Sequence, residues 1–234
     1  RMGVPSSAVL AAARERALEH GADAELVAGM GDGYTGFWAD LDCGPGPVTA
    51  FRFDMDCNEV AECAEESHRP VREGFASRWP GLMHACGHDG HAAVGLGLAE
   101  VLVSIRRHLR GRIRLIFQPA EEGARGALPM SEAGAVDGVD VLFGFHIGFK
   151  AEGPGSLICG TQGFLATTKR DVLFSGVPAH AGAAPEEGKD ALLAACSAVV
   201  NLHAISRNGK GGTRIAVGRL EGGEARNVIP ASAR

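Results

Sequence analysis

The sequence predicts an α/β fold in which helices flank an open, mostly parallel sheet, followed by a small α+β domain. Up to about Phe164, apolar strand-like segments alternate with helical segments. Three of those strand-like segments end in residues with acid–base or metal-binding chemistry. After Phe164 the segments become more polar and alternate in hydropathy. We therefore expect a first domain over residues 1–164 and a second domain over residues 165–234.

The first elements of the chain are expected to be a helix and a strand. Ser6 or Ser7 can cap a helix that runs to about His20, because serine is a frequent helix cap and apolar residues recur on one face. The segment GPVTAFRFDMD then predicts a strand that ends at Asp54–Asp56, after the turn-prone CGPGP. Residues 58–82 are expected to form an exposed, charged loop.

A longer helix and two further strands complete the first domain. Apolar residues at helical spacing predict a helix from about Gly90 to Leu109. GRIRLIFQP predicts a strand of alternating apolar residues that Pro119 ends. VDVLFGFHI is a continuous apolar run, which is typical of a strand buried on both faces.

The second domain is expected to contain a strand, a helix and another strand. TTKRDVLFSG at residues 167–176 is a polar, alternating strand, and the segment at residues 189–206 is an amphipathic helix. GTRIAVGRL at residues 212–220 predicts a further strand. This order indicates a small α+β domain, which we expect to be cut off before its last elements.

Chemically active side chains follow the predicted strands. Residues at or just beyond strand ends carry a carboxylate or an imidazole: Asp54, Asp56, Glu121, Glu122 and His146. Cys86 and His88 stand at the entry to the long helix. In an open α/β sheet the carboxyl ends of the strands converge on one crevice, where ligands bind. We therefore expect these segments to meet at one point.

The stretch MHACGHDGH, from Met83 to His91, allows three interpretations. Cys86 could be a nucleophile, although a histidine two residues away is an unusual way to supply its base. His84 and His88 could be half of a structural zinc site, but no matching second half follows. The third interpretation is a catalytic site of one or two metals, since thiolate, imidazole and carboxylate all suit Zn²⁺. His91 either lines that site or simply belongs to the first turn of the helix.

These residues also carry a family resemblance. FRFDMD, MHACGHDGHAA, FQPAEEGARGA and GFHIG, in that order, resemble the M20 metallopeptidase family in its amidohydrolase branch. GVPAHAGAAPEEGKDALLAA and ARNVIPASA resemble the lid-domain motifs of that family. The resemblance implies that residues 1–164 are the N-terminal part of a metal-binding catalytic domain. It also implies that residues 165–234 are an incomplete, ferredoxin-like lid and dimerisation domain.

The resemblance implies specific roles around two divalent ions, Mn²⁺ or Zn²⁺. Cys86, His88, Glu122 and His146 match metal ligands, and Glu121 matches the general base. A further histidine ligand normally comes from a segment near the family's C-terminus. We therefore expect this chain to hold four of the usual five ligands.

Four other residues have expected roles, and three of them also have a plainer alternative. Asp54 and Asp56 are expected to orient the ligand imidazoles, or else to be turn-forming aspartates at a strand end. His180, in the stretch PAHAG, matches a lid histidine that donates to the substrate carbonyl, but it could be a plain surface histidine. Asn227 matches a residue that helps to hold substrate.

The function implied by the resemblance is metal-dependent hydrolysis of the amide bond of N-acyl amino acids. The expected substrate is p-aminobenzoyl-glutamate or a similar aromatic N-acyl glutamate or aspartate. The expected assembly is a homodimer or a heteromer with a related subunit. Two alternatives remain: a non-catalytic paralogue that acts by dimerisation through the lid, and an amidase with a cysteine nucleophile.

Composition argues against nucleic-acid and membrane partners. The formal net charge is −5 and there is no Lys/Arg-rich run. The longest nearly apolar run, Ala92 to Ile105, contains Glu100 and is too short to span a bilayer. The six cysteines lack any C-x-x-C pair, which favours a reducing, cytoplasmic setting.

Overall fold

The computed structural model describes residues 5–148, 153, 155–160, 162–163, 165–206, 209 and 211–234. The chain divides into two compact units, Arg1–Glu152 and Gly153–Arg234, whereas the sequence analysis places a domain boundary after residue 164. In the described parts of the chain, no helix is both long and apolar enough to cross a membrane.

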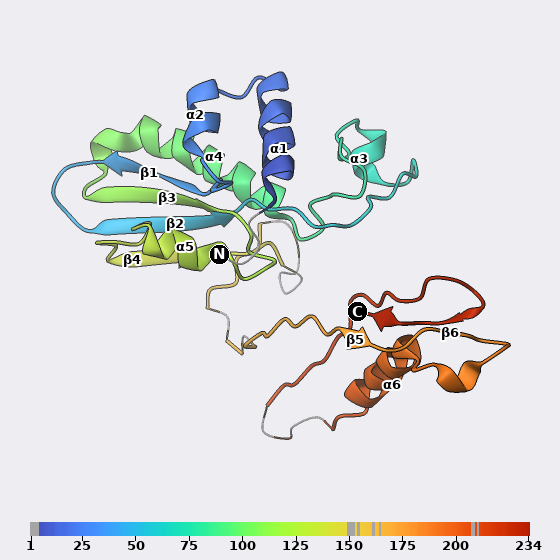
Figure 1. Cartoon of the computed structure of the whole chain (residues 1–234). Helices are drawn as coiled ribbons and strands as arrows, with labels where there is room; N and C mark the ends of the chain where they lie inside the picture. The colour runs from blue at the N-terminus through green and yellow to red at the C-terminus, as the bar shows by residue number, and fades with distance from the viewer. Residues whose placement is uncertain are drawn as a thin grey trace. The chain divides into compact units, whose positions relative to one another are not determined.

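The first unit is built on a four-stranded sheet with the strand order β1-β3-β2-β4 (Figure 1). The strands are β1 (Phe37–Asp42), β2 (Val48–Asp54), β3 (Arg112–Gln118) and β4 (Val141–Gly144). β2 pairs in parallel with both β3 and β4, while β1 lies antiparallel to β3 at one edge. The predicted α/β class is therefore confirmed, with a sheet that is mixed because of β1. That strand is absent from the sequence prediction.

Six helical segments accompany this sheet: α1 (Ser7–Glu19), α2 (Ala24–Gly29), α3 (Arg69–Arg72), α4 (His88–Ile105), the 3₁₀ helix η1 (Arg106–His108) and α5 (Ala127–Glu132). Ser6 caps α1 by accepting the Val9 N–H, as its sequence predicts. The long predicted helix is confirmed as α4, and its first residue is His88. Neither α2 nor α5 is predicted.

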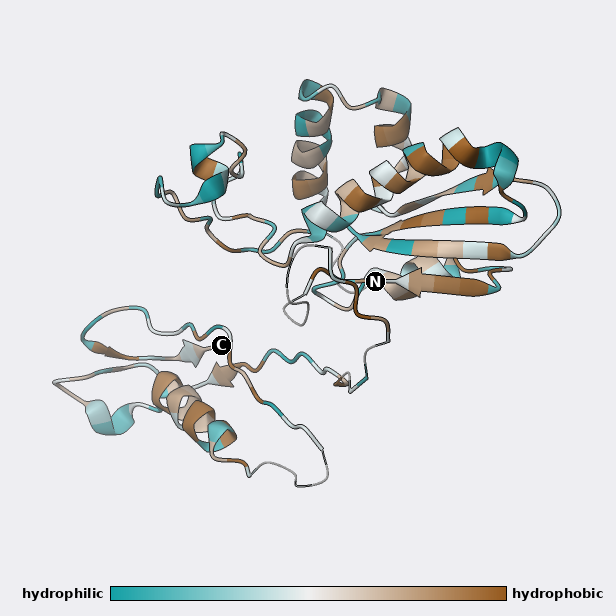
Figure 2. Cartoon of the chain, turned by 180° about the vertical axis from the view of Figure 1, so that it is seen from behind, coloured by the Kyte–Doolittle hydropathy of each residue, from teal (hydrophilic) through white to brown (hydrophobic). Residues whose placement is uncertain are grey.

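Apolar clusters cover both faces of the sheet. On one face, Phe53, Ile113, Leu115 and Phe117 pack with Leu102 of α4. On the other face the cluster consists of Ala50, Ile116, Met130 and Ala135, of which Met130 belongs to α5. Figure 2 shows that α4 lies across the sheet and that much of this helix is hydrophobic. The sheet is therefore sandwiched between α4 and α5, with its strand ends left free.

Part of α4 is exposed, and the burial predicted for one strand is wrong. Val94 and Val101 of α4 are 50% and 54% exposed, because the side of the helix that meets the sheet carries Gly95 and Leu102 instead. The segment predicted as a strand buried on both faces forms β4, whose residues are all exposed in the described structure. β4 is an edge strand that pairs only with β2 within the described residues, so its apolar side chains are left uncovered.

The described residues of the second unit form two small antiparallel strand pairs, an α-helix and a 3₁₀ helix. β5 (Phe174–Ser175) pairs with β8 (Ser232–Ala233), and β6 (Ala179–His180) pairs with β7 (Val228–Ile229). The predicted helix is α6 (Ala191–His203), which Asp190 caps, and η2 (Pro185–Glu187) precedes it. Of the strand predicted at residues 167–176, only β5 forms. Residues 212–220 contain no strand, so that prediction is wrong: alternation in hydropathy does not supply the partner strand that a ladder requires.

Candidate metal centre

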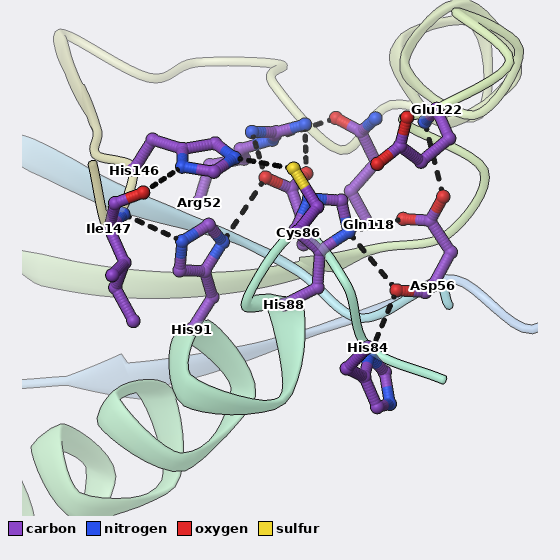
Figure 3. A network of polar contacts seen from close by, with 11 residues as sticks. Arg52, Asp56, His84, Cys86, His88, His91, Gln118, Glu122, His146 and Ile147 are labelled. Carbon is purple, nitrogen blue, oxygen red and sulfur yellow. Dashed lines mark hydrogen bonds and ion pairs between the residues drawn. The ribbon is translucent and has the colours of Figure 1, made fainter. Parts of the chain in front are cut away.

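The side chains of interest lie at the edge where β2, β3 and β4 end. Asp54 is the last residue of β2, and Asp56 lies two residues further. Glu121 and Glu122 follow β3, and His146 follows β4. Because β2, β3 and β4 are mutually parallel, their carboxyl ends share one edge of the sheet. The structure thus brings together the predicted residues of the first unit, and Figure 3 shows Asp56, Glu122 and His146 from these segments around His88.

A sharp turn before α4 brings Cys86 to the same edge. Gly87 adopts a left-handed conformation (φ +80°), which is costly for residues with a side chain. The backbone N–H of Cys86 donates to the Oδ1 of Asn58 at 3.2 Å. These two features direct the thiol toward the segment after β4, where its Sγ lies 3.4 Å from the Nε2 of His146.

The imidazoles of His88 and His146 each have an unprotonated nitrogen that can bind a cation. The Nδ1 of His88 lies 3.1 Å from the backbone oxygen of Asp56 and 3.2 Å from its Oδ1. Since both are acceptors, we assign the proton to Nδ1, which leaves a lone pair on Nε2. The Nδ1 of His146 lies 2.5 Å from the Ile147 oxygen, which assigns the same tautomer. The Nε2 of His88 is buried and has no hydrogen-bond partner.

Two overlapping groups of side chains fit divalent cations. Cys86, His88 and His146 each offer one ligand atom, and these atoms lie within 4.8 Å of one another. His88, Glu121 and Glu122 satisfy the same condition. The combined set of sulfur, nitrogen and oxygen donors suits Zn²⁺ or a similar ion. A cation would also satisfy the buried Nε2 of His88, whose desolvation is otherwise uncompensated.

A third group, Asp54, His88 and His91, satisfies the same distance condition. The Oδ1 of Asp54 and the Nδ1 of His91 are buried without a hydrogen-bond partner in the described structure, while the other polar atoms of these two side chains bind protein groups. The Asp54 carboxylate pairs with the guanidinium of Arg52, whose Nη1 donates at 2.7 Å. The Nε2 of His91 accepts the backbone N–H of Ile147 at 2.9 Å. Burial raises the pKa of Asp54, and the charge of Arg52 opposes that rise. We therefore interpret these residues as support for the other two groups.

The chemistry of Cys86 argues against a nucleophile. Burial, together with the hydrogen bond and negative charge of Glu122 and the charge of Glu121, raises the pKa of its thiol to about 11. Reactive cysteines have a lowered pKa, because a nearby positive charge stabilises the thiolate. His146 is close enough to act as a base, but the two carboxylates disfavour the thiolate it would create. A bound cation reverses this balance, since metals bind the thiolate form.

The loop that carries Glu121 and Glu122 has a strained backbone. Ala120 and Ala124, which flank the two glutamates, have φ values of +53° and +51°. Residues with a side chain adopt this region rarely, and such strain clusters at functional sites. The backbone N–H of Glu122 donates to the Oδ2 of Asp56 at 3.1 Å, which ties this loop to the residue that orients His88.

Three residues of the site were missed or left open by the sequence analysis. Arg52 donates through Nε to the Oε1 of Gln118 at 2.9 Å and also binds Asp54. An arginine within the apolar strand FRFD is itself a signal, because a charged residue there requires a partner. His91 is fully buried beside Asp54. Its position in the first turn of α4 could not by itself distinguish a site residue from a packing residue.

The remaining predicted residues, His180 and Asn227, belong to the second unit. They are neighbours there, since Ala181, next to His180, donates its N–H to the backbone oxygen of Asn227 at 2.9 Å. The Nδ1 of His180 accepts the N–H groups of Gly182 and Ala183 at 3.1 and 3.0 Å. The proton of this imidazole therefore lies on Nε2, which is available as a donor.

Comparison with known proteins finds a family model and several relatives that match this chain. Residues 50–218 match the model of peptidase family M20/M25/M40. The whole chain is 52% identical to one of the subunits of p-aminobenzoyl-glutamate hydrolase of Escherichia coli (strain K12), and 52% identical to indole-3-acetyl-aspartic acid hydrolase of Enterobacter agglomerans. In both cases it covers 53% of the relative, so the chain spans about half the length of these proteins.

A solved structure shares the fold. It is an aminobenzoyl-glutamate utilization protein from Klebsiella pneumoniae, with 45% sequence identity and a TM-score of 0.71. The match covers 100% of this chain and 52% of that chain.

Proposed function

The chain belongs to peptidase family M20/M25/M40, and on this basis we propose that it supplies the metal-binding part of an amidohydrolase acting on N-acyl amino acids. The observation that carries the proposal is the cluster of thiol, imidazole and carboxylate groups at the ends of β2, β3 and β4. The buried, unpartnered Nε2 of His88 lies within that cluster. A buried nitrogen of this kind is costly unless a ligand satisfies it.

The proposed ligands are Cys86, His88, Glu122 and His146, for two divalent ions, Mn²⁺ or Zn²⁺. The number of ions follows the family resemblance, and the Nε2 of His88 can bind one of them, because the Nδ1 of this ring carries its proton. When bound, such ions lower the pKa of water and polarise a carbonyl group. Asp56 orients His88 and holds the loop of Glu122, so it is a proposed orienting residue. Asp54 is proposed to act in the same way through His91.

Glu121 is the proposed general base. It lies beside Glu122 in the strained loop, so one carboxylate can bind a cation while the other remains free to exchange a proton. Glu121 takes a proton from the attacking water and then delivers it to the leaving amine. The C–N bond of the amide breaks, and the products are a carboxylic acid and a free amino acid.

His180 and Asn227 are proposed to act on the substrate from a lid and dimerisation domain, residues 165–234. The Nε2–H of His180 is a donor suited to the oxyanion that forms on the substrate carbonyl. Asn227 is proposed to hold the substrate. The Escherichia coli relative is named as one subunit of a hydrolase, which supports an assembly with a related chain, and a homodimer is the other possibility.

The proposed substrates are aromatic N-acyl glutamates and aspartates, with p-aminobenzoyl-glutamate first. The names of the two relatives support this class, since both describe an aromatic acyl group joined to an acidic amino acid. We also propose a cytoplasmic location, because the spacing of the six cysteines suits a reducing compartment.

The test combines metal analysis with an activity panel on the full chain. We expect Mn²⁺ or Zn²⁺ to bind stoichiometrically, and amide hydrolysis of N-acyl glutamates or aspartates to be lost on chelation and restored by metal. N-acyl amino acids with neutral side chains should be poorer substrates. Metal binding without hydrolysis of any panel member would instead support a non-catalytic, dimerising paralogue. Hydrolysis that survives chelation would contradict the proposal.

A further inference from the structure

His91 contacts several parts of the candidate metal centre, and the proposed function uses it only as the link between Asp54 and that centre. It is fully buried in the first turn of α4, three residues after His88. Its ring stacks on that of His88 with 5.2 Å between centroids. It also meets the ring of His146 nearly at a right angle, with 4.5 Å between centroids. Figure 3 shows the His91 ring directed at Ile147, the residue after His146.

The hydrogen bond from Ile147 to His91 holds the segment that carries His146. The pairing of β4 with β2 ends at Gly144, so that ladder does not fix the residues beyond it. Ile147 directly follows His146 and donates its backbone N–H to the Nε2 of His91 at 2.9 Å. The backbone oxygen of Ile147 lies 2.5 Å from the Nδ1 of His146. Ile147 is therefore bound to α4 on one side and to the His146 imidazole on the other.

The other nitrogen of His91 faces a buried ion pair. Because Nε2 accepts a hydrogen bond, the ring proton lies on Nδ1, which is 3.4 Å from the Oδ2 of Asp54. Asp54 in turn binds Arg52, and Arg52 binds the side chain of Gln118. This chain of contacts runs from β3 through β2 to α4. The Nδ1 of His91 is buried and makes no hydrogen bond in the described structure, so the hydrogen bond at Nε2 is the contact that orients the ring.

We propose that His91 is a positioning residue that holds the Ile147 amide, and through it the imidazole of His146, at the location a cation requires beside Cys86 and His88. This inference rests on the metal-binding role proposed above. Residues that support a metal ligand from behind affect affinity, because a loosely held ligand must be ordered when the ion binds. Loss of His91 should therefore loosen the segment after β4 and weaken metal binding.

Substitutions of His91 distinguish the roles of the two ring nitrogens. His91→Leu removes both polar contacts. His91→Gln places an amide near the position of Nε2, where its oxygen can accept the Ile147 N–H. His91→Asn places an amide near Nδ1 and leaves Ile147 without an acceptor. His108→Leu is the matched control, because His108 is an exposed histidine in η1.

Two measurements on the full chain test the proposal, one of them without metal. The first is the hydrogen-exchange rate of the Ile147 amide in the metal-free protein, followed by NMR. The second is titration with Co²⁺, followed by its d–d absorption bands. For His91→Leu we expect about tenfold faster exchange, about 10–100-fold weaker Co²⁺ binding and shifted bands. His91→Gln should recover most of each value, and His108→Leu should match the wild type.

The outcomes separate this inference from the proposed function. If the wild type binds Co²⁺ and His91→Leu leaves both the exchange rate and the affinity unchanged, the role of His91 is wrong and the metal site stands. If the wild type binds no Co²⁺, both proposals are overturned. If circular dichroism shows that His91→Leu is unfolded, the Asn and Gln variants decide. Equal Co²⁺ affinity in those two variants would overturn the role of the Ile147 contact.

Discussion

The side chain of Asp56 joins His88 to Glu122. Its Oδ1 lies 3.2 Å from the Nδ1 of His88, and its Oδ2 accepts the backbone N–H of Glu122 at 3.1 Å. One carboxylate therefore orients an imidazole on α4 and a loop that follows β3. The two groups of candidate metal ligands share His88, so both depend on Asp56, which orients it.

The Asp56 contacts predict a loss of metal affinity in Asp56→Ala. This variant removes both carboxylate contacts but keeps the backbone oxygen that also faces His88. We expect about 10–100-fold weaker Zn²⁺ binding, measured by competition with a chelator. Glu100→Gln, an exposed change on α4, is the control and should bind as the wild type does. Unchanged affinity in Asp56→Ala would show that the backbone contact alone orients His88.

Replacing each of the paired glutamates with glutamine should affect a different property of the protein. Glu121→Gln should lower the turnover number by about 10²–10⁴-fold or more, because it removes the proton acceptor. Its metal content should stay the same. Glu122→Gln should instead lower metal affinity, since an amide oxygen is a weaker ligand than a carboxylate. Metal analysis and steady-state kinetics on both variants check this, and a reversed pattern would exchange the two proposed roles.

The raised pKa of Cys86 predicts that metal affinity increases with pH. With a pKa of about 11, the thiol is protonated in the metal-free protein at neutral pH. Binding as a thiolate must then release this proton. This group alone should strengthen Zn²⁺ binding by about tenfold for each pH unit below that pKa. Titrations at several pH values measure the slope, and Cys86→Ser should lose this component of it.

The sequence was sufficient to predict which segments meet, but not how they are held. Parallel strands share their carboxyl edge, so residues such as Glu121 and His146 could be expected to converge from strand order alone. The contacts of Arg52 with Gln118 and of His91 with Ile147 join residues far apart in the chain. No local pattern encodes such partners: the register of β2 against β3 places Arg52 near Gln118, and the packing of α4 beside the segment after β4 places His91 near Ile147.

The failures in the second unit have a related cause. The sequence of residues 212–220 predicts a strand, yet they pair with no strand in the described part of the unit. β6 and β7 are only two residues long, too short for any periodicity to be detected. Strand formation there depends on tertiary pairing, which outweighs local propensity.

The lowered pKa of His91 predicts a pH-dependent loss of stability in the metal-free protein. Burial, and then the nearby charges of His146 and His88, lower this pKa from 6.5 to about 4. Between these values the unfolded chain binds a proton that the folded chain does not, so stability falls as the pH falls from 6.5 to 4. The raised pKa of Asp54 acts in the opposite direction. The His91 contribution is about 3 kcal/mol at most.

Urea unfolding at pH 4.5 and pH 7 measures this effect. The loss of unfolding free energy at the lower pH should be smaller in His91→Gln, which cannot take up a proton there. His108→Gln should retain the full dependence, since His108 is exposed. Equal pH dependence in wild type and His91→Gln would mean that other groups account for the acid sensitivity.

The close packing of α4 on the sheet predicts opposite effects from two glycine substitutions in that helix. A Cβ on Gly95 would lie 2.8 Å from the Cε1 of Phe117 and 2.9 Å from the Cδ2 of Phe53, so the helix or the rings must move. We expect Gly95→Ala to destabilise the protein by about 1–3 kcal/mol. Gly97 faces open space, and Gly97→Ala should stabilise it by about 0.5–1 kcal/mol through helix propensity.

The same two glycine substitutions also test how the packing of α4 affects the candidate metal centre. The first turn of α4 carries His88 and His91, so a shift of the helix away from Phe53 and Phe117 displaces both imidazoles. We therefore expect Gly95→Ala to bind Zn²⁺ more weakly as well, while Gly97→Ala binds it as the wild type does. Thermal unfolding and chelator competition measure the two effects. If Gly95→Ala is as stable as Gly97→Ala, α4 packs less closely on the sheet than the distances at Gly95 imply.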